Sequence, residues 1–94
     1  MDPIQKRNHD AERVRTCIEG LESNDSVAKT LSFDLAMDLM AELGTSVLLN
    51  WGEDGGLWEM SWITGGQRFS GFSKDKYKAV RDVLAEVEAL AEKR

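Results

Sequence analysis

The fold is decided by residues 46–63, which read SVLLNWGEDGGLWEMSWI. On both sides of the glycine-rich loop at 52–56 the hydrophobic pattern has a period of two, which is typical of β-strands. Two such stretches joined by a loop that contains glycines indicate a β-hairpin. In the second stretch Trp58, Met60 and Trp62 share one face. We predict that this face meets the helices, because aromatic side chains carry large burial energy.

The opposite face of the second strand is thinner and more polar. It carries Leu57, Glu59, Ser61 and Ile63. We expect this face to be half-exposed, since helices that accompany a small sheet can all lie on its other side. A partner or a second copy of the chain could dock there, so the sequence leaves a homodimer open.

A third strand and a long helix follow the hairpin. A turn at 64–66 leads into a strand at 67–72, in which Gly71 predicts a weak point or a bulge. Residues 74–92 have the spacing of an amphipathic helix, with Ser73 as the expected N-cap. The apolar face of this helix is formed by Tyr77, Val80, Leu84, Val87 and Ala91.

Two helices are predicted before the hairpin. The first has Pro3 at its first helical position. The second is expected over residues 33–43, between Ser32 as N-cap and Gly44 just past its end. Residues 27–31 are ambiguous and could form a helical turn that leads into it.

The composition fits a single small globular domain, with 41% hydrophobic and 31% charged residues in a chain of 94. The element order is α-α-β-β-β-α, so we predict one α+β domain in which helices pack on an antiparallel meander. The sequence has no apolar run suited to a bilayer and no apolar secretory segment near its first residues, so we expect no membrane association. A single cysteine cannot form an internal disulfide, which favours a cytoplasmic location.

The net charge of −5 is concentrated in the middle of the chain. Residues 23–64 carry one basic and seven acidic side chains, whereas residues 65–94 carry seven basic and five acidic ones. Direct nucleic-acid binding is disfavoured, because it needs Lys and Arg side chains to displace the counterions of phosphate groups. The charge is suited to a basic partner instead.

The acidic block supplies the candidate partner-binding residues. The apolar stripe of the second helix is formed by Ala36, Leu39, Met40 and Leu43 and widened by Phe33, Leu35 and Met37. Asp34, Asp38 and Glu42 recur every four residues and therefore form one ridge opposite this stripe. This ridge is a solvated face, an acidic contact surface for a basic partner or, as a third alternative, a site for a divalent metal. The candidates from the hairpin are Glu53, Asp54 and Glu59.

Catalytic and metal-binding motifs are missing from the sequence. His9 is the only histidine, and no serine or cysteine is tied to it by a motif, so we expect an ordinary surface histidine. Cys17 lies beside the apolar face of the first helix and is expected to behave as a small hydrophobe. We therefore predict no catalytic residue, no metal site and no cofactor, and hence no enzyme.

Residues 71–79, GFSKDKYKA, resemble the strand-to-helix junction of double-stranded-RNA-binding domains. The helix-strand-strand-strand-helix order from residue 33 onward is also similar. This resemblance implies an alternative function, in which lysines at the start of the last helix contact phosphates. The residues of this alternative are Arg68, Lys74, Lys76, Lys78 and Arg81. Simple solubility, with Lys78 and Asp82 as a helical pair, accounts for the same residues without a nucleic acid.

In general character the chain is similar to small acidic phage-encoded inhibitors of host defence, among them anti-CRISPR proteins. The likeness rests on its size, its acidic middle block and the lack of an enzyme motif. It implies an acidic surface that blocks a basic, nucleic-acid-handling partner. Our leading hypothesis from the sequence is therefore a non-enzymatic protein-binding domain of this inhibitor type.

Overall fold

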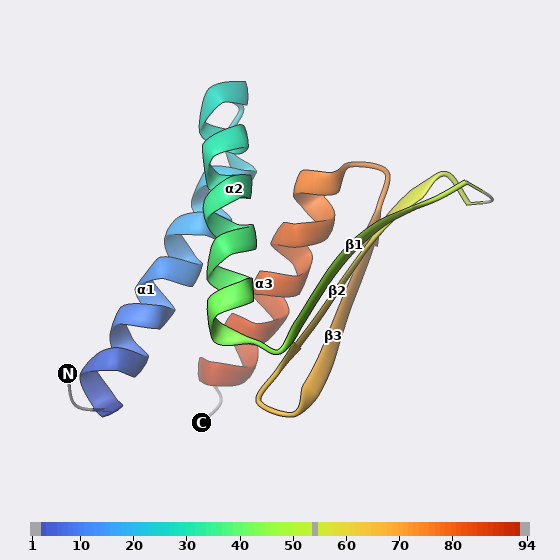
Figure 1. The fold of residues 1–94 in the computed structure, drawn as a ribbon. Coiled ribbons are helices and arrows are strands. Elements are labelled where there is room, and N and C mark those ends of the chain that lie inside the picture. The colour runs from blue at the N-terminus through green and yellow to red at the C-terminus, as the bar shows by residue number, and fades with distance from the viewer. Residues whose placement is uncertain (1–2, 54, 93–94) are drawn as a thin grey trace.

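The computed structural model describes residues 3–53 and 55–92, with side chains for residues 9–53 and 55–90. Its elements confirm the predicted α-α-β-β-β-α order of an α+β fold (Figure 1). In chain order they are α1 (Pro3–Glu22), α2 (Ser26–Leu43), β1 (Ser46–Gly52), β2 (Leu57–Thr64), β3 (Gln67–Ser73) and α3 (Lys76–Glu92).

The described strands form one antiparallel sheet in the order β1-β2-β3. In its register, Phe69 of β3 lies opposite Trp62 of β2, and Gly71 lies opposite Met60. This pairing runs unbroken through Gly71, so the alternative of a bulge was wrong. A Cβ atom at residue 71 would lie 2.8 Å from the carbonyl oxygen of Ala79. Glycine is therefore needed there for the close approach of α3 to β3.

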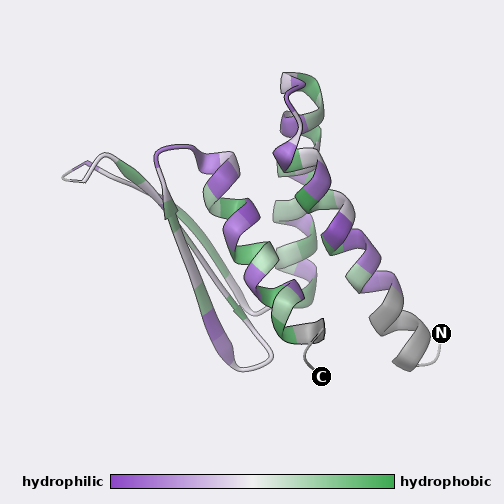
Figure 2. Cartoon of the chain, turned by 180° about the vertical axis from the view of Figure 1, so that it is seen from behind, coloured by the Kyte–Doolittle hydropathy of each residue, from purple (hydrophilic) through white to green (hydrophobic). Residues whose placement is uncertain are grey.

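The helices lie on one side of the sheet (Figure 1). α3 packs on β2 and β3, the end of α2 contacts β1, and α1 packs against α2 and α3 on the side away from the sheet. Hydrophobic and hydrophilic residues alternate along the helices, as expected where each helix buries one face (Figure 2). The buried apolar residues are Val14, Cys17, Ile18, Leu21, Ala36, Leu39, Met40, Met60, Trp62, Phe69, Ala79, Val80, Val83 and Leu84.

The predicted orientation of the sheet is confirmed. Met60 and Trp62 are 0% and 1% exposed against the helices, and Trp58 on the same face is half-buried. On the opposite face, which no described helix covers, the half-buried residues are Leu57, Glu59 and Ile63. Ser61 departs from the expectation and is buried, and its Oγ accepts a hydrogen bond of 2.9 Å from Nε of Arg68.

Two side chains of β2 donate hydrogen bonds to carbonyl groups at the C-terminal end of α2. Nε1 of Trp62 donates to the carbonyl oxygen of Met40 at 2.9 Å, and Oγ1 of Thr64 donates to that of Leu43 at 3.0 Å. The carbonyl of Leu43 belongs to the last turn, where backbone partners within the helix are lacking, whereas that of Met40 also accepts from the backbone N–H of Gly44 at 3.0 Å. Gly44 ends the helix as predicted, but with a φ of −121° that any residue can adopt. Its role is spatial, because a Cβ atom there would overlap the indole nitrogen of Trp62.

The start of α2 differs from the prediction. The helix begins at Ser26, because Oδ1 of Asp25 accepts a hydrogen bond of 3.0 Å from the backbone N–H of Val27 and caps it. Residues 27–31 are therefore helical, and Ser32 lies inside the helix instead of capping it. The predicted start near residue 33 was wrong by about two turns.

The start of α3 differs for the same reason. Oδ1 of Asp75 accepts from the backbone N–H of Tyr77 at 2.9 Å, so this aspartate takes the capping place predicted for Ser73. Oγ of Ser73 instead accepts from the backbone N–H of Asp75 at 3.2 Å. A carboxylate makes the stronger, charge-assisted bond to a backbone N–H.

Candidate functional site

α2 exposes a ridge of large apolar side chains. Val27, Leu31 and Leu35 are 65%, 60% and 59% exposed. Their spacing of four residues places them along one line of the helix surface. The first turns of α2 extend beyond the start of α3 (Figure 1). A contiguous exposed apolar surface of this kind is typical of a site that meets a partner.

The ridge was not predicted from the sequence. With the helix start placed near residue 33, Val27 and Leu31 fell outside the helix, and Leu35 was assigned to the buried stripe. The signal that could have found it is the spacing of four residues that joins all three, together with Asp25 as an N-cap two residues before Val27.

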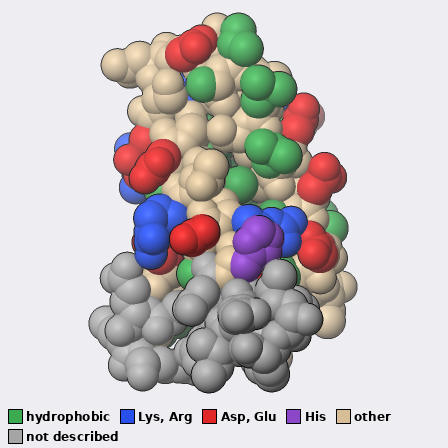
Figure 3. Space-filling model, turned by 90° about the vertical axis from the view of Figure 1, so that its left-hand side faces the viewer, with side chains coloured by type: hydrophobic (Ala, Val, Ile, Leu, Met, Phe, Trp, Pro, Cys, Tyr) green, Lys and Arg blue, Asp and Glu red, His purple; other side chains and the backbone are tan. Residues whose placement is uncertain are grey.

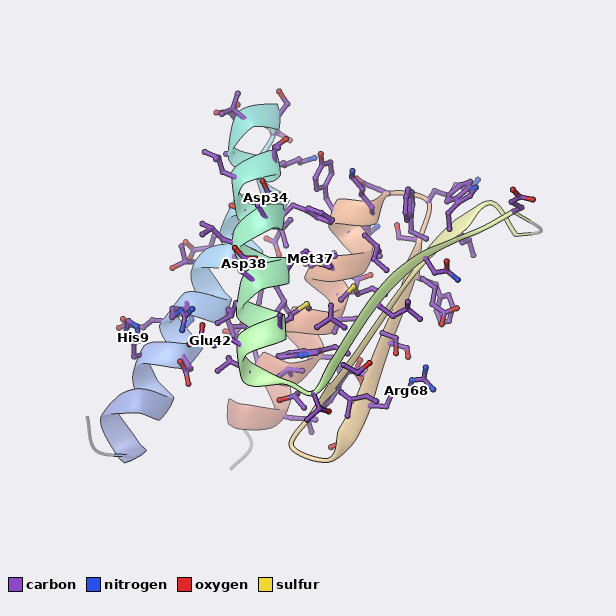
Figure 4. All side chains as sticks on the ribbon, viewed as in Figure 1. His9, Asp34, Met37, Asp38, Glu42 and Arg68 are labelled. Carbon is purple, nitrogen blue, oxygen red and sulfur yellow. The ribbon has the colours of Figure 1, made fainter. Side chains whose placement is uncertain are left out.

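Asp34, Asp38 and Glu42 form a second line beside the apolar ridge, on the outer side of α2 (Figure 4). Asp34 is three residues after Leu31, and Asp38 is three residues after Leu35, a spacing at which helical side chains are neighbours. Asp34 and Asp38 are exposed and have no hydrogen-bond or ion-pair partner among the described residues. Figure 3 shows hydrophobic side chains gathered on the face of α1 and α2, with acidic side chains along one edge.

Glu42 is held by α1. Its carboxylate accepts two hydrogen bonds from Arg13, at 2.6 Å from Nη2 and 3.3 Å from Nη1. Nη1 of Arg13 also lies 3.5 Å from the carboxylate of Asp10. The hydrogen bond to Glu42 raises the pKa of Arg13 above its ordinary value, although desolvation opposes the shift. The charge of Glu42 is thus balanced within the fold, and Asp34 and Asp38 carry the free acidic charge of the edge.

A groove of about 240 Å³ runs between α1 and α2 beside the ridge. Cys17 and Leu39 are its buried residues, and Leu35 belongs to both the groove and the ridge. Its other lining residues, all from α1, are His9, Glu12, Arg13 and Thr16. The groove and the ridge therefore form one continuous surface.

Cys17 is only 5% exposed, as expected for a small hydrophobe on the apolar side of α1. Burial raises the pKa of its thiol above the ordinary value, although the charge of Arg13 acts in the opposite direction. A thiol that stays protonated packs as a small hydrophobe and is a poor nucleophile.

The other predicted acidic residues lie apart from α2. Glu53 is exposed at the turn of the β1–β2 hairpin. Glu59 lies on the uncovered face of the sheet, between Asn50 and Phe72 in the register. Asp54 lies outside the described residues. Of the predicted acidic residues that the structure describes, only the three on α2 are therefore brought together.

The basic residues of the RNA-binding alternative do not all share one patch. Arg68 lies near the end of β3 that is remote from the start of α3 (Figure 4). Arg81 pairs with Asp82 at 3.1 Å and with Glu22 at 3.8 Å. The expected pairing of Asp82 with Lys78 was wrong, because Arg81 takes its place.

The three lysines near the start of α3 have different environments. Nζ of Lys76 lies 5.2 Å from the ring centre of Phe33 and 5.5 Å from that of Tyr77, which are cation–π distances. Lys74 and Lys78 are exposed. Lys78 shares a pocket of about 240 Å³ with Lys29 and Arg81, and Glu22 and Asp75 line the same pocket, so basic and acidic side chains are mixed there.

An aromatic pair lies near the tip of the β1–β2 hairpin. Trp51 and Trp58 lie opposite each other in the register, with ring centroids 5.3 Å apart. Trp51 is 45% exposed, because the hairpin projects past α3 (Figure 1). Such a cross-strand pair stabilises the hairpin that carries it.

Among the residues that the structure describes, no three His, Cys, Asp or Glu side chains are placed to hold a metal ion. The acidic line on α2 is therefore no such cluster. Within the same residues, no helix combines the length and the hydropathy required to cross a lipid bilayer. No protein-family model, curated protein or solved structure matches this chain.

Proposed function

We propose that this protein is a non-enzymatic binding domain that docks a basic protein partner on α2. Its docking surface consists of Val27, Leu31 and Leu35 with the carboxylates of Asp34 and Asp38. The observation that carries the proposal is that three apolar side chains, 59–65% exposed, lie beside two carboxylates that have no partner in the described part of the chain.

The apolar ridge supplies the driving force for binding. Full burial of a Val or Leu side chain contributes roughly 1.5–3 kcal/mol. A partner that buries the exposed part of these three side chains therefore gains several kcal/mol of binding free energy. Without a partner, such a surface promotes aggregation, which the neighbouring carboxylates oppose.

The carboxylates determine which partners bind. Asp34 and Asp38 repel an acidic surface and attract a basic one, so they discriminate between partners of similar shape. The net charge of −5 extends this attraction to longer range. Association is then fast at low salt and slows as the ionic strength rises.

The partner in this proposal uses the same basic surface to handle nucleic acid, so the bound chain acts as an inhibitor. This is the mode of action implied by the likeness to small acidic phage-encoded inhibitors. We place the interaction in the cytoplasm, where a lone cysteine such as Cys17 stays reduced.

The test compares two double variants with the same change in net charge. Asp34→Lys/Asp38→Lys alters the docking surface, whereas Glu53→Lys/Glu86→Lys alters exposed carboxylates on the hairpin and on α3. The partner is captured from host extract on the wild-type chain, identified by mass spectrometry and titrated by calorimetry at low and high salt. We expect the first variant to bind about tenfold more weakly or worse, a loss of about 1.4 kcal/mol, and the second to bind as the wild type.

Two results would count against the proposal. Equal affinities of the two variants at both salt concentrations would contradict a contact between the partner and the carboxylates of Asp34 and Asp38. A partner that keeps its nucleic acid when saturated with this chain would contradict the inhibitory action and leave the docking on α2 in place.

A further inference from the structure

We infer that the segment docked on this surface is a basic amphipathic helix of the partner, lying along α2 and over the groove between α1 and α2. The inference rests on the proposed function and names the chemistry of what binds.

The surface has the length of a short helix. Val27 and Leu39 are twelve residues apart on α2, which corresponds to about 18 Å at about 1.5 Å per residue. Leu35 joins the exposed ridge to the groove, which Leu39 lines with only 2% of its surface exposed, so the ridge and the groove together extend over this distance. It accommodates about three turns of a helix laid alongside α2.

A helix fits this surface better than an extended segment does. The backbone groups of α2 are engaged in its own hydrogen bonds, so the ridge offers side chains only. An extended segment needs the edge of a sheet to pair its N–H and C=O groups. A helix brings those groups already paired, and a ridge with a spacing of four residues packs into the grooves of another helix.

The position of the charges defines the partner further. Asp34 and Asp38 lie four residues apart on one edge of the ridge, so the matching helix carries Lys or Arg with the same spacing beside its apolar stripe. A second copy of this chain is a poor match. Two copies packed antiparallel through their ridges would place these carboxylates against each other, and each copy has a net charge of −5.

Three synthetic 18-residue peptides serve as probes. The first has leucines at alternating spacings of three and four residues and lysine elsewhere. The second has the same composition, with its leucines at every other position in the middle of the peptide and lysine at both ends, and the third has the first pattern with glutamate in place of lysine. We expect only the first to bind, to gain helical circular dichroism, and to shift backbone amide resonances of α2 and of the groove-lining residues of α1.

Two variants of this chain show where the peptide binds. Leu31→Lys alters the ridge, and Leu48→Lys is the matched control, since Leu48 is also exposed, at 48%, on the uncovered face of the sheet. We expect Leu31→Lys to weaken binding of the first peptide about tenfold or more and Leu48→Lys to leave it within about twofold. Thermal melts confirm that both variants are folded.

The inference would be overturned if the second peptide bound more tightly than the first, or if the resonance shifts were confined to the sheet. Equal losses of affinity in the Leu31→Lys and Leu48→Lys variants would overturn it too. Self-association of the wild type that Leu31→Lys abolishes would assign the surface to a second copy and overturn it as well. If Asp34→Lys/Asp38→Lys weakens the natural partner while the helical peptide does not bind α2, the proposed function stands and this inference falls.

Discussion

At the scale of single residues, Gly44 decides how closely α2 approaches the sheet. Its φ of −121° is open to every residue, so replacing it tests space alone. We expect Gly44→Ala to lower the free energy of unfolding by about 1–3 kcal/mol, because the methyl group would overlap the indole of Trp62. Urea denaturation measures the change.

Gly55→Ala is the control for this prediction. A Cβ atom at residue 55 would have its nearest neighbour 4.0 Å away, so we expect a change within about 0.5 kcal/mol. Equal stabilities of the Gly44→Ala and Gly55→Ala proteins would show that the contact between Gly44 and Trp62 has room to relax.

Cys17 gives a second test at this scale. Burial raises the pKa of its thiol in the folded state, so folding favours the protonated form. Its contribution to stability is complete below the ordinary thiol pKa of about 8.5 and is lost as the pH rises from there through the higher folded-state pKa. We expect urea denaturation to show a loss of stability above about pH 8.5. Cys17→Ala, which has no thiol, is expected to lack that part of the loss, and the same pH profile in both proteins would contradict the argument.

At the scale of elements, the orientation of β2 makes the sharpest prediction. Trp62 is 1% exposed and closes the last turn of α2 through its bond to the carbonyl of Met40. We expect Trp62→Ala to cost about 3–5 kcal/mol, which unfolds a domain of this size or leaves it marginal. Thermal melts followed by circular dichroism measure this loss.

Glu59→Arg is the contrast on the opposite face of the same strand. Because no described helix covers Glu59, we expect the melting curve to stay unchanged and any effect to be on association, which light scattering measures. A stable Trp62→Ala protein, or a Glu59→Arg protein with a lowered melting temperature, would contradict the prediction that the Trp62 side of β2 is the buried one.

The sequence predicted the strands and their buried face well, because a period of two assigns every second residue to the same side. It predicted helix starts poorly, because Ser32 and Asp25 are both good N-caps and only the fold chooses between them. The choice had consequences for function. Placing the cap at Ser32 hid the ridge of Val27, Leu31 and Leu35, whose four-residue spacing is visible once the helix begins at Ser26.

At the scale of the whole molecule, proximity along the chain did not predict proximity in space. The acidic block of residues 23–64 spans α2, β1 and β2, so the fold distributes its charges over α2, the hairpin turn and the uncovered face of the sheet. The groove between α1 and α2 could not be predicted either. It depends on the packing of two helices, and the hydrophobic pattern of each one gives only the face that it buries.

The same distribution of charge predicts weak binding of nucleic acid. Arg68 lies on the uncovered face of the sheet, apart from the other basic residues of the RNA-binding alternative, and Arg81 is paired with acidic residues, in a molecule of net charge −5. We expect no gel shift of double-stranded RNA or DNA at low salt with tens of micromolar protein, roughly the range of ordinary non-specific affinities. Lys74→Glu/Lys78→Glu is the control, because these lysines are the exposed ones near the start of α3. A shift in the wild type that this variant abolishes would show that two lysines at a helix start outweigh the acidic remainder, and it would favour the RNA-binding alternative over a protein partner.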